Sequence, residues 1–365
     1  MPDQHWENLK QIFHGAVALA PAERHTYLDH ACDGNASLRH AVESLIKSHE
    51  ETNNFVDVPA YQAAAEMLVN SLDLKPGKNI AHYRIERLLG EGGMGTVYLA
   101  EDTKLHRKVS MKFLSTRFIQ DPERLRRFEQ EARAASALNH PNIIHIYEIG
   151  HSDSTHFIAA EYLDGATLRT YLATTPMQSS EVVDIAGQVA GALAAAHAKG
   201  VVHRDIKPEN IMVLKENYSL HRENYVKVLD FGIAKLTETA SDAEAPTKPL
   251  IETNQGVVLG TVSYMSPEQA RGLPVDARTD IWSLGVVLYE MLTNHLPFIG
   301  ETAEDVRAAI LKDKPSPLPA EIPERLKWIV AKALRKERED RYQTAREIFS
   351  DLRELQQEFT SESLQ

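Results

Sequence analysis

The sequence predicts an α+β protein, in which strands and helices occupy different parts of the chain. Two short segments, 96–99 and 109–111, combine β-branched, aromatic and apolar residues, which favours strands. From Asp121 to Leu138, an N-cap and a proline are followed by apolar residues at helical spacing, which favours a helix. Apolar residues also recur at helical spacing in residues 1–50, so a small all-α module is expected at the start of the chain.

Residues 1–75 are predicted to form this helical N-terminal module and a linker. A first helix is expected over 6–17, a second opens at Pro21, and a third covers 38–46. The Lys75-Pro76-Gly77 sequence then indicates a boundary. A module of this size buries only a small core, so we expect it to dock on the rest of the chain or on a partner.

A glycine-rich segment follows at Gly90-Glu91-Gly92-Gly93-Met94-Gly95, with the spacing G-x-G-x-x-G. Dinucleotide-binding folds share this spacing, but there the glycines open a helix. Here residues 96–99 favour a returning strand, so the segment is expected to form the tip of a hairpin. Without Cβ atoms, the backbone of such a tip can lie against phosphate oxygens and donate N–H groups to them. Taken alone, the segment is equally compatible with an ordinary glycine-rich turn.

Lys112 ends an apolar strand, where an unpaired ammonium group would be costly to bury. It therefore needs anions, and both nucleotide phosphates and a carboxylate from the following helix can supply them. Glu131 is the preferred carboxylate because of the Arg-Phe-x-x-Glu-Ala register, and Glu129 is the alternative.

Residues 203–210 read His-Arg-Asp-Ile-Lys-Pro-Glu-Asn, and the proline prevents a regular helix. Phosphoryl transfer needs a carboxylate near the attacking hydroxyl, a cation on the migrating phosphate and oxygen ligands for Mg²⁺. Asp205, Lys207 and Asn210 can supply these groups. Asp230, in Asp-Phe-Gly, adds a second carboxylate for the metal. In this order and spacing, the motifs predict an enzyme that moves a phosphoryl group.

On these motifs, residues 80–357 resemble a eukaryotic-type protein kinase domain, and especially its bacterial Ser/Thr branch, the Hanks-type kinases. Ser266-Pro267-Glu268, Asp280 and Arg341 stand where that family has scaffold residues. The resemblance implies a bilobal protein kinase fold with a β-rich N-lobe and a mainly helical C-lobe, preceded by the all-α module. It leaves 358–365 as a tail. It also implies ATP as phosphate donor, with Mg²⁺ or Mn²⁺ as cofactor.

The resemblance also assigns roles to matching residues. Lys112 contacts the α and β phosphates and pairs with Glu131, while Asp205 orients the substrate hydroxyl. The implied catalytic set is Asp205, Lys207, Lys112, Glu131 and Thr261, with Asn210 and Asp230 as metal ligands. The implied nucleotide-binding set is Leu89, Gly90, Glu91, Gly92, Gly93, Met94, Gly95, Val97, Ser110, Lys112, Ala160, Glu161, Leu163, Met212 and Asp230, with Leu229 in the adenine pocket. Lys207 and the Gly260-Thr261 step follow the Ser/Thr pattern, so a Ser or Thr hydroxyl of a protein is the expected acceptor.

Two residues of the adenine pocket depart from the family pattern. Ser110 replaces the usual alanine and brings a hydroxyl near adenine, where it needs a hydrogen-bond partner. Ala160, at the back of the pocket, is unusually small. Neither change affects the phosphate chemistry.

Regulation by phosphorylation is predicted from Arg204 and the long segment that follows Asp230. An arginine beside Asp205 needs an anion, and a phosphate on this segment can provide one. Thr253 is the preferred site, because it lies eight residues before Thr261 (261 minus 253), where the resemblance to bacterial Ser/Thr kinases implies an activating threonine; Thr247, Thr239 and Ser241 are weaker candidates. A polar loop without a phosphosite is the alternative.

Composition constrains the partners and the location of the protein. The net charge is −12, from 40 basic and 52 acidic residues in 365, which argues against nucleic acid as the main partner. Cys32 is the single cysteine, which excludes an intramolecular disulfide and fits a reducing cytoplasm. No long apolar stretch or signal peptide is found, so no membrane insertion within this chain is expected. Protein substrates and ATP are the expected partners, and a homodimer that phosphorylates itself in trans is compatible with them.

Two other functional classes are weighed against an active protein kinase. A pseudokinase scaffold that binds nucleotide without transfer is expected to lack Lys112, Asp205 or Asp230, and all three are present. A small-molecule kinase would share the phosphate chemistry. However, Ser266-Pro267-Glu268 and the long segment before it are typical of enzymes that dock a polypeptide.

Overall fold

In a computed structural model, the chain forms two compact units, one containing residues 1–71 and one that begins at Leu72. Each unit is described by itself. The described residues are 12–13, 15–17, 19, 21–32, 38–39, 42–43, 46, 74–92, 95–114, 122–152, 155–174, 176–214, 224–231 and 262–363.

The described part of the first unit contains helix α2 (Pro21–Ala31) and a small apolar core. The predicted opening of a helix at Pro21 is thus confirmed, as proline fits the first turn, where no intrahelical N–H is needed. The core consists of Ile12, Phe13, Ala16, Leu28, Cys32, Leu38, Val42 and Ile46. These positions agree with the helical spacing in the sequence.

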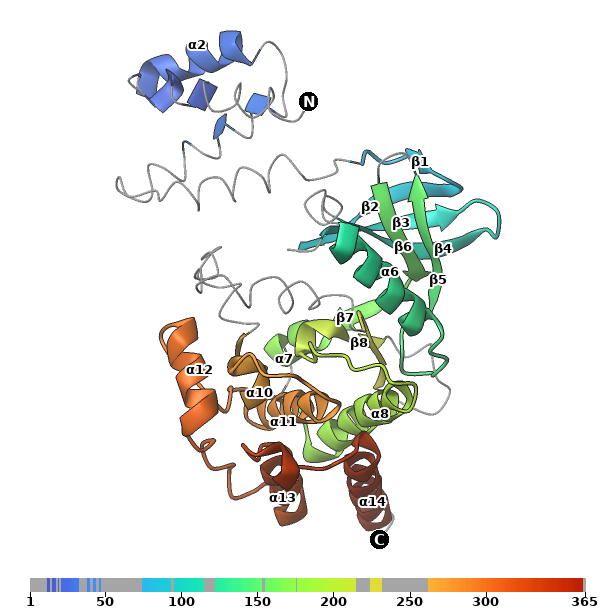
Figure 1. The fold of residues 1–365 in the computed structure, drawn as a ribbon, viewed down its shortest axis with the longest axis vertical. Helices are drawn as coiled ribbons and strands as arrows, with labels where there is room; N and C mark the ends of the chain where they lie inside the picture. Colours follow the sequence, from blue (N-terminus) through green and yellow to red (C-terminus); the bar gives the residue numbers. More distant parts are fainter. Residues whose placement is uncertain are drawn as a thin grey trace. The chain divides into compact units, whose positions relative to one another are not determined.

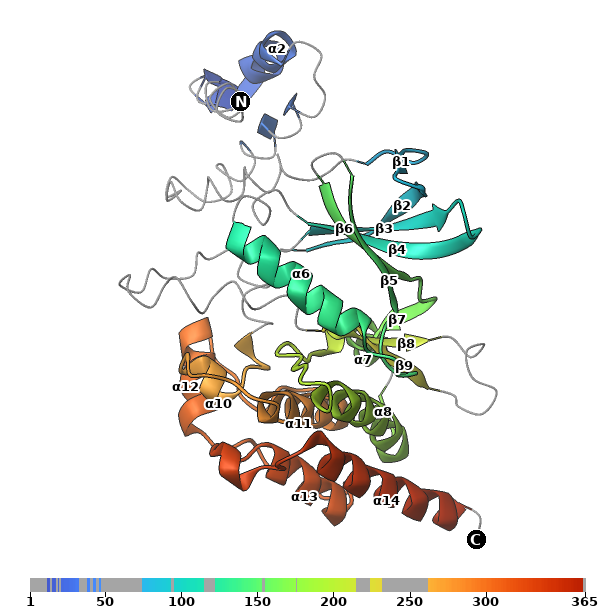
Figure 2. The ribbon, with the colours of Figure 1, turned by 45° about the vertical axis from the view of Figure 1, so that its right-hand side comes forward.

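The second unit begins with an antiparallel sheet of six strands among the described residues, in the order β1-β2-β3-β4-β6-β5. Its strands are β1 (Asn79–Ile80), β2 (Tyr83–Gly92), β3 (Gly95–Asp102), β4 (Arg107–Leu114), β5 (Ile146–Ser152) and β6 (Thr155–Glu161). The aromatic rings of Tyr83, Tyr98, Phe113 and Phe157 are buried in the core of this sheet. Helix α6 (Pro122–Ser136) lies beside the sheet (Figure 2).

A second, mainly helical part follows, with a small sheet of β7 (Gly165–Thr167), β8 (Ile211–Leu214) and β9 (Tyr225–Val228). Its helical segments are α7 (Leu168–Thr174), α8 (Ser179–His197), η1 (Pro208–Asn210), α10 (Pro267–Ala270), α11 (Arg278–Thr293), α12 (Ala303–Lys312), α13 (Glu324–Ala333), η3 (Arg338–Asp340) and α14 (Ala345–Ser363). Every residue of α11 from 279 to 291 is buried, as expected for a helix inside a core. Figure 1 shows these helices gathered at one end of the unit and strands β1–β6 at the other, which agrees with the predicted β-rich and helical lobes.

Candidate active site

A cavity of about 620 Å³ lies where the two lobes meet. The structure brings together around it the residues predicted for the adenine pocket, although they come from segments far apart in the sequence. Those lining it are Leu89, Val97, Ser110, Ala160, Glu161, Leu163, Met212 and Leu229, together with Lys112 and Asp230. A cleft with a mainly apolar lining and a few charged groups is the usual form of a small-molecule site, which suits a nucleotide.

The glycine-rich segment forms the predicted hairpin, because β2 and β3 pair antiparallel up to Gly92 and Gly95. Gly95 has φ 144°, and a Cβ at this position would lie 1.8 Å from the carbonyl oxygen of Phe113. Because Phe113 lies on β4, a side chain at position 95 would force β3 away from β4. Gly93 and Met94, at the tip, lie outside the described residues.

The hydroxyl of Ser110 has the partner that the sequence required. Its Oγ donates to the carbonyl oxygen of Glu161 at 3.1 Å, and lies 3.4 Å from that of Ala160. Ser110 therefore binds the segment 160–163, which forms one wall of the cavity, and its burial carries no penalty for an unmade hydrogen bond.

The same wall is held from the other side by an ion pair. The carboxylate of Glu161 pairs with Lys227 of β9 and accepts a hydrogen bond from the backbone N–H of His145 at 2.8 Å. The backbone N–H of Glu161 donates to the carbonyl of His145 at 2.9 Å. Both the backbone and the side chain of Glu161 are thus restrained, which fixes the position of this wall of the cavity.

Lys112 pairs with Asp230, whose Oδ2 lies 2.7 Å from the lysine Nζ. The expected pairing of Lys112 with Glu131 is therefore wrong for this structure. Glu131 Oε1 lies instead 3.4 Å from Arg204, and its Oε2 is buried without a hydrogen-bond partner among the described residues. Burial raises the pKa of Glu131 to about 7, although Arg204 acts in the opposite direction. The physical reason for the difference is that each cation takes the carboxylate nearest to it, and Asp230 is nearer to Lys112.

Asp205, Lys207 and Asn210 converge in the loop before β8. Asp205 Oδ2 lies 2.8 Å from Lys207 Nζ and accepts a hydrogen bond from Asn210 Nδ2 at 3.1 Å. Asn210 Nδ2 also donates to the carbonyl of Asp205 at 2.8 Å, which leaves the amide oxygen as the group available to a cation. The backbone N–H of Asp205 donates to His203 Nδ1 at 3.2 Å, and His203 Nε2 donates to the carbonyl of Leu229 at 2.7 Å. The loop therefore sets the position of the Asp205 carboxylate through several independent contacts.

Two residues beside these side chains have a left-handed backbone. Arg204 has φ 67° and Asp230 has φ 50°, a conformation that costs non-glycine residues free energy and is concentrated at functional sites. At Arg204 the surrounding structure compensates, because Asp280 accepts hydrogen bonds from the backbone N–H groups of His203 and Arg204 at 2.8 and 2.7 Å. Asp280 thus braces residues 203–210, the catalytic loop, which agrees with the scaffold position that the resemblance gives it.

The other scaffold pair is also formed. Arg341 is fully buried and donates two hydrogen bonds to the carboxylate of Glu268, each 2.8 Å long. Thr261 and the predicted phosphosite Thr253 lie outside the described residues.

The sequence did not reveal a cluster around Arg169 of α7. Its guanidinium pairs with Glu209, next to Asn210, at 2.8 Å and with Glu290 of α11 at 2.6 Å. It also contacts the hydroxyl of Tyr264, and Tyr264 donates to Glu290 at 2.5 Å. Burial raises the pKa of the Tyr264 phenol, and Glu290 raises it further. Such a cluster joins four segments that are distant in the sequence, and no spacing of residues could have indicated it.

The sequence predicts the apolar lining of the cavity only in part. It indicates the small side chain of Ala160, but not five further apolar residues. These are Ala135, Ile143, Ile146, Ile158 and Phe231, which also line the cavity. Their apolar character is common to any core position, so the sequence carried no signal that distinguishes them.

Comparison with known proteins agrees with this geometry. Residues 83–352 match the protein kinase domain family. The chain is 41% identical over 290 residues to the serine/threonine-protein kinase pkn3 of Myxococcus xanthus, covering 77% of this chain and 51% of that protein. It is 40% identical over 285 residues to the serine/threonine-protein kinase PrkC of Bacillus subtilis, covering 76% of this chain and 41% of that protein. The chain thus spans about half, or less, of the length of the curated relatives it matches.

A solved structure has the same fold. The crystal structure of the Mycobacterium tuberculosis PknI kinase domain aligns with a TM-score of 0.59 and 28% sequence identity, covering 77% of this chain and 99% of that one. In the part of the chain that the structure describes, no helix has the length and hydropathy needed to cross a membrane.

Proposed function

Because the chain belongs to the protein kinase domain family, we propose that it transfers the γ-phosphate of ATP to serine or threonine hydroxyls of proteins. The observation that carries this proposal is the convergence of Asp205, Lys207 and Asn210 in one loop, beside the cavity where Lys112 meets Asp230. A carboxylate, two cations and an amide oxygen are the groups that phosphoryl transfer requires. The retention of all of them argues against the pseudokinase alternative.

The residues divide the work by position. Asp205 is held by Lys207 and Asn210, so its carboxylate can orient a substrate hydroxyl and accept its proton. Lys207 offers a cation for the γ-phosphate, and Lys112 offers one for the α and β phosphates. The rigid wall at 160–163 and the glycine hairpin hold the nucleotide from its two ends.

The donor set also fits a divalent cation. Asp230 supplies a carboxylate, and the amide of Asn210 is oriented with its oxygen available. Oxygen ligands of this kind suit Mg²⁺, and also Mn²⁺. When bound, the ion would neutralise phosphate charge, while Lys112 and Lys207 keep their own contacts to phosphate.

The wider setting of this activity follows from the sequence. We place the protein in the cytoplasm of a bacterium, with proteins as substrates, including a second copy of this chain. The support is the bacterial relatives named serine/threonine-protein kinases, and the single cysteine of the chain.

The test is to incubate the purified chain with ATP and Mg²⁺, measure ADP release and map every phosphorylated residue by mass spectrometry. Lys112→Met and Asp205→Asn should abolish transfer while the protein stays folded, because a single lost electrostatic contact to the transferring group costs about 3–4 kcal/mol. Lys108→Met, on the same strand but with a largely exposed side chain, is the matched control and should keep normal activity. If either active-site variant retained more than a few per cent of wild-type activity, the role assigned to that residue would be wrong.

A further inference from the structure

The backbone of Arg204 is held at both ends by side chains from outside the catalytic loop. Its N–H donates to Asp280 Oδ1 at 2.7 Å, and its carbonyl accepts a hydrogen bond from Gln269 Nε2 at 2.9 Å. Asp280 is a scaffold residue of α11, whereas Gln269 lies on the short helix α10. Because Arg204 is left-handed and immediately precedes Asp205, the carbonyl contact acts on the peptide that orients Asp205.

The orientation of the Gln269 amide is determined by the start of α10. The side-chain Oε1 accepts a hydrogen bond from the backbone N–H of Ser266 at 3.0 Å, and the backbone N–H of Gln269 donates to Ser266 Oγ at 3.3 Å. These two bonds form a capping box. With the amide oxygen occupied by Ser266, the amide nitrogen must point the other way, toward the carbonyl of Arg204.

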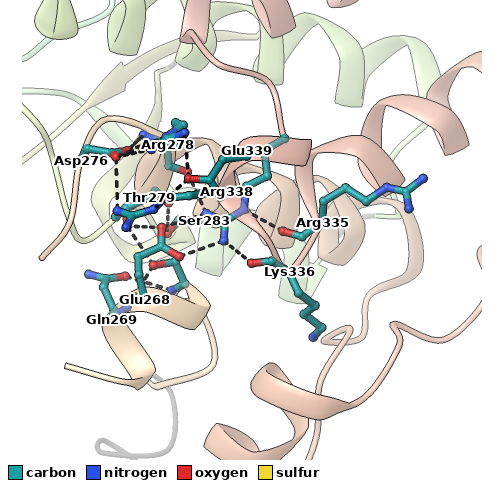
Figure 3. A network of polar contacts seen from close by, with 12 residues as sticks. Glu268, Gln269, Asp276, Arg278, Thr279, Ser283, Arg335, Lys336, Arg338 and Glu339 are labelled. Atoms are coloured by element: carbon teal, nitrogen blue, oxygen red, sulfur yellow. Dashed lines mark hydrogen bonds and ion pairs between the residues drawn. The ribbon is translucent and has the colours of Figure 1, made fainter. Parts of the chain in front are cut away.

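Helix α10 itself is tied to the core of the lobe. Figure 3 shows Glu268 and Gln269 side by side at the edge of a polar network that reaches residues 335–339. Within it, Glu268 pairs with Arg341, and Thr279 contacts both Glu268 and Ser266, at 2.9 and 2.8 Å. The side chain of Gln269 thus extends from a fixed base, so a contact made by its amide can restrain the loop it reaches.

From these contacts we propose that Gln269 is a positioning residue for phosphoryl transfer, one that holds the Arg204–Asp205 peptide in place through the Arg204 carbonyl. The proposal rests on the proposed kinase function. Asp280 holds the N–H of Arg204 and Gln269 holds its carbonyl, so the loss of either contact frees the Arg204 backbone to relax toward the negative φ that non-glycine residues favour. That relaxation would turn the N–H of Asp205 away from His203 and displace the Asp205 carboxylate.

The competing explanation is that Gln269 serves only to cap α10, and Gln269→Glu separates the two roles. A carboxylate keeps an oxygen that can accept the hydrogen bond of Ser266 N–H, but it has no N–H to donate to Arg204. Gln343→Glu is the matched control, because Gln343 Nε2 also donates to backbone carbonyls, those of Arg338, Glu339 and Arg341. These carbonyls belong to the scaffold and not to the catalytic loop.

The experiment compares the two variants with the wild-type chain in three measurements: kcat and KM for phosphorylation of a peptide, thermal stability, and hydrogen exchange of residues 201–206. We expect Gln269→Glu to lower kcat about tenfold or more, with KM for ATP changed less than about twofold, because a small displacement of a reacting group is costly. Exchange at the amides of Arg204 and Asp205 should rise. Gln343→Glu should leave kcat and this exchange unchanged, even if it lowers the melting temperature.

The proposal is overturned if Gln269→Glu keeps both the wild-type kcat and the wild-type exchange. It is also overturned if the two variants lose activity in parallel with their loss of stability, which would indicate a structural role only. If Gln269→Glu does not fold, Gln269→Met removes both the donor and the capping oxygen without adding charge. A loss of kcat and a rise in exchange at Arg204 and Asp205 that exceed its loss of stability then support the proposal, and their absence overturns it. A wild-type chain without activity would contradict the proposed kinase function, while the exchange measurement would still decide the role of Gln269.

Discussion

Replacing Arg341 with methionine should strongly destabilise the larger unit. Arg341 is buried and donates to both oxygens of Glu268, and it also donates to the carbonyls of Arg335 and Lys336 at 2.7 and 2.9 Å. Arg341→Met would leave the Glu268 carboxylate buried without its cation. Breaking a buried pair in this way typically costs about 3–5 kcal/mol. For a unit of this size, 1 kcal/mol corresponds to about 2–4 °C, so the melting temperature should fall by roughly 10 °C.

The pH dependence of stability provides an independent check on this explanation. In the wild-type chain burial opposes ionisation of Glu268, but Arg341 outweighs it and holds the pKa of this carboxyl below its ordinary value. A carboxyl whose pKa is depressed in the folded state stabilises the fold at pH values above its ordinary pKa. This contribution is lost as the pH falls through the depressed pKa. Without Arg341, burial, the largest influence on this carboxyl, is opposed only by hydrogen bonds from Thr279 and a backbone N–H. The pKa of Glu268 should therefore rise, so that as the pH falls the folded state takes up a proton before the unfolded state does. The difference in unfolding free energy between the wild-type chain and Arg341→Met should therefore shrink as the pH is lowered from about 7 to about 5.

The assay is urea or thermal unfolding, followed by circular dichroism at both pH values. Arg325→Met is the control, because Arg325 pairs with Glu354 and Glu358 at the surface, where such pairs contribute less than about 1 kcal/mol. If Arg341→Met were no less stable than Arg325→Met, the buried pair would not stabilise the unit. A deficit that grows at low pH would also refute the explanation, since it would mean that Glu268 is not left uncompensated.

Three further changes have defined outcomes. Ala160→Met should exclude ATP analogues with bulky apolar N6 groups while sparing ATP, because the longer side chain fills the back of the cavity. Competition assays with the wild-type chain and the variant measure this selectivity, and equal use of the analogues by both would refute the prediction. Deletion of residues 1–75 should leave a folded kinase whose autophosphorylation rate or self-association differs from that of the full chain; an insoluble or unchanged product contradicts a regulatory module. Finally, kcat/KM should rise with pH through about 7, because Glu131 must be ionised to pair with a cation of the site, Arg204 in this structure, and burial raises its pKa to about 7. In Glu131→Gln the rise should be absent, and its persistence would assign it to another titrating group.

The elements that the sequence predicted correctly depend on local chemistry. A hairpin follows from glycines flanked by β-branched residues, and a helix at Pro21 follows from the fixed φ of proline. The catalytic loop was equally readable, because Asp205, Lys207 and Asn210 contact one another within five positions of the chain. Such contacts need only the correct local conformation, and the motif itself specifies it.

Contacts between distant segments could not be predicted from the sequence, because they depend on which of several charged groups comes nearest in the folded chain. Lys112 and Asp230 are 118 positions apart, and Arg169 and Glu290 are 121 apart. The sequence indicated that Lys112 needs an anion, but Glu131 and Asp230 satisfy that requirement equally well in principle. Gln269 was missed for the same reason, since a glutamine after Ser266-Pro267-Glu268 has no signature that points to the carbonyl of Arg204.

The expected and the observed pairings of Lys112 nevertheless use the same four charges. Two cations, Lys112 and Arg204, share two carboxylates, Asp230 and Glu131. The arrangement is uneven, because Asp230 lies 2.7 Å from its cation, while Glu131 lies 3.4 Å from Arg204 and has a raised pKa. If Asp230 held a metal ion, as proposed above, Lys112 would lose its carboxylate partner. Glu131 is then the carboxylate that would gain most by pairing with Lys112. A Glu131 paired with Lys112 would leave Arg204 free, and Arg204 is the residue that we expect to bind a phosphate on the long segment that follows Asp230.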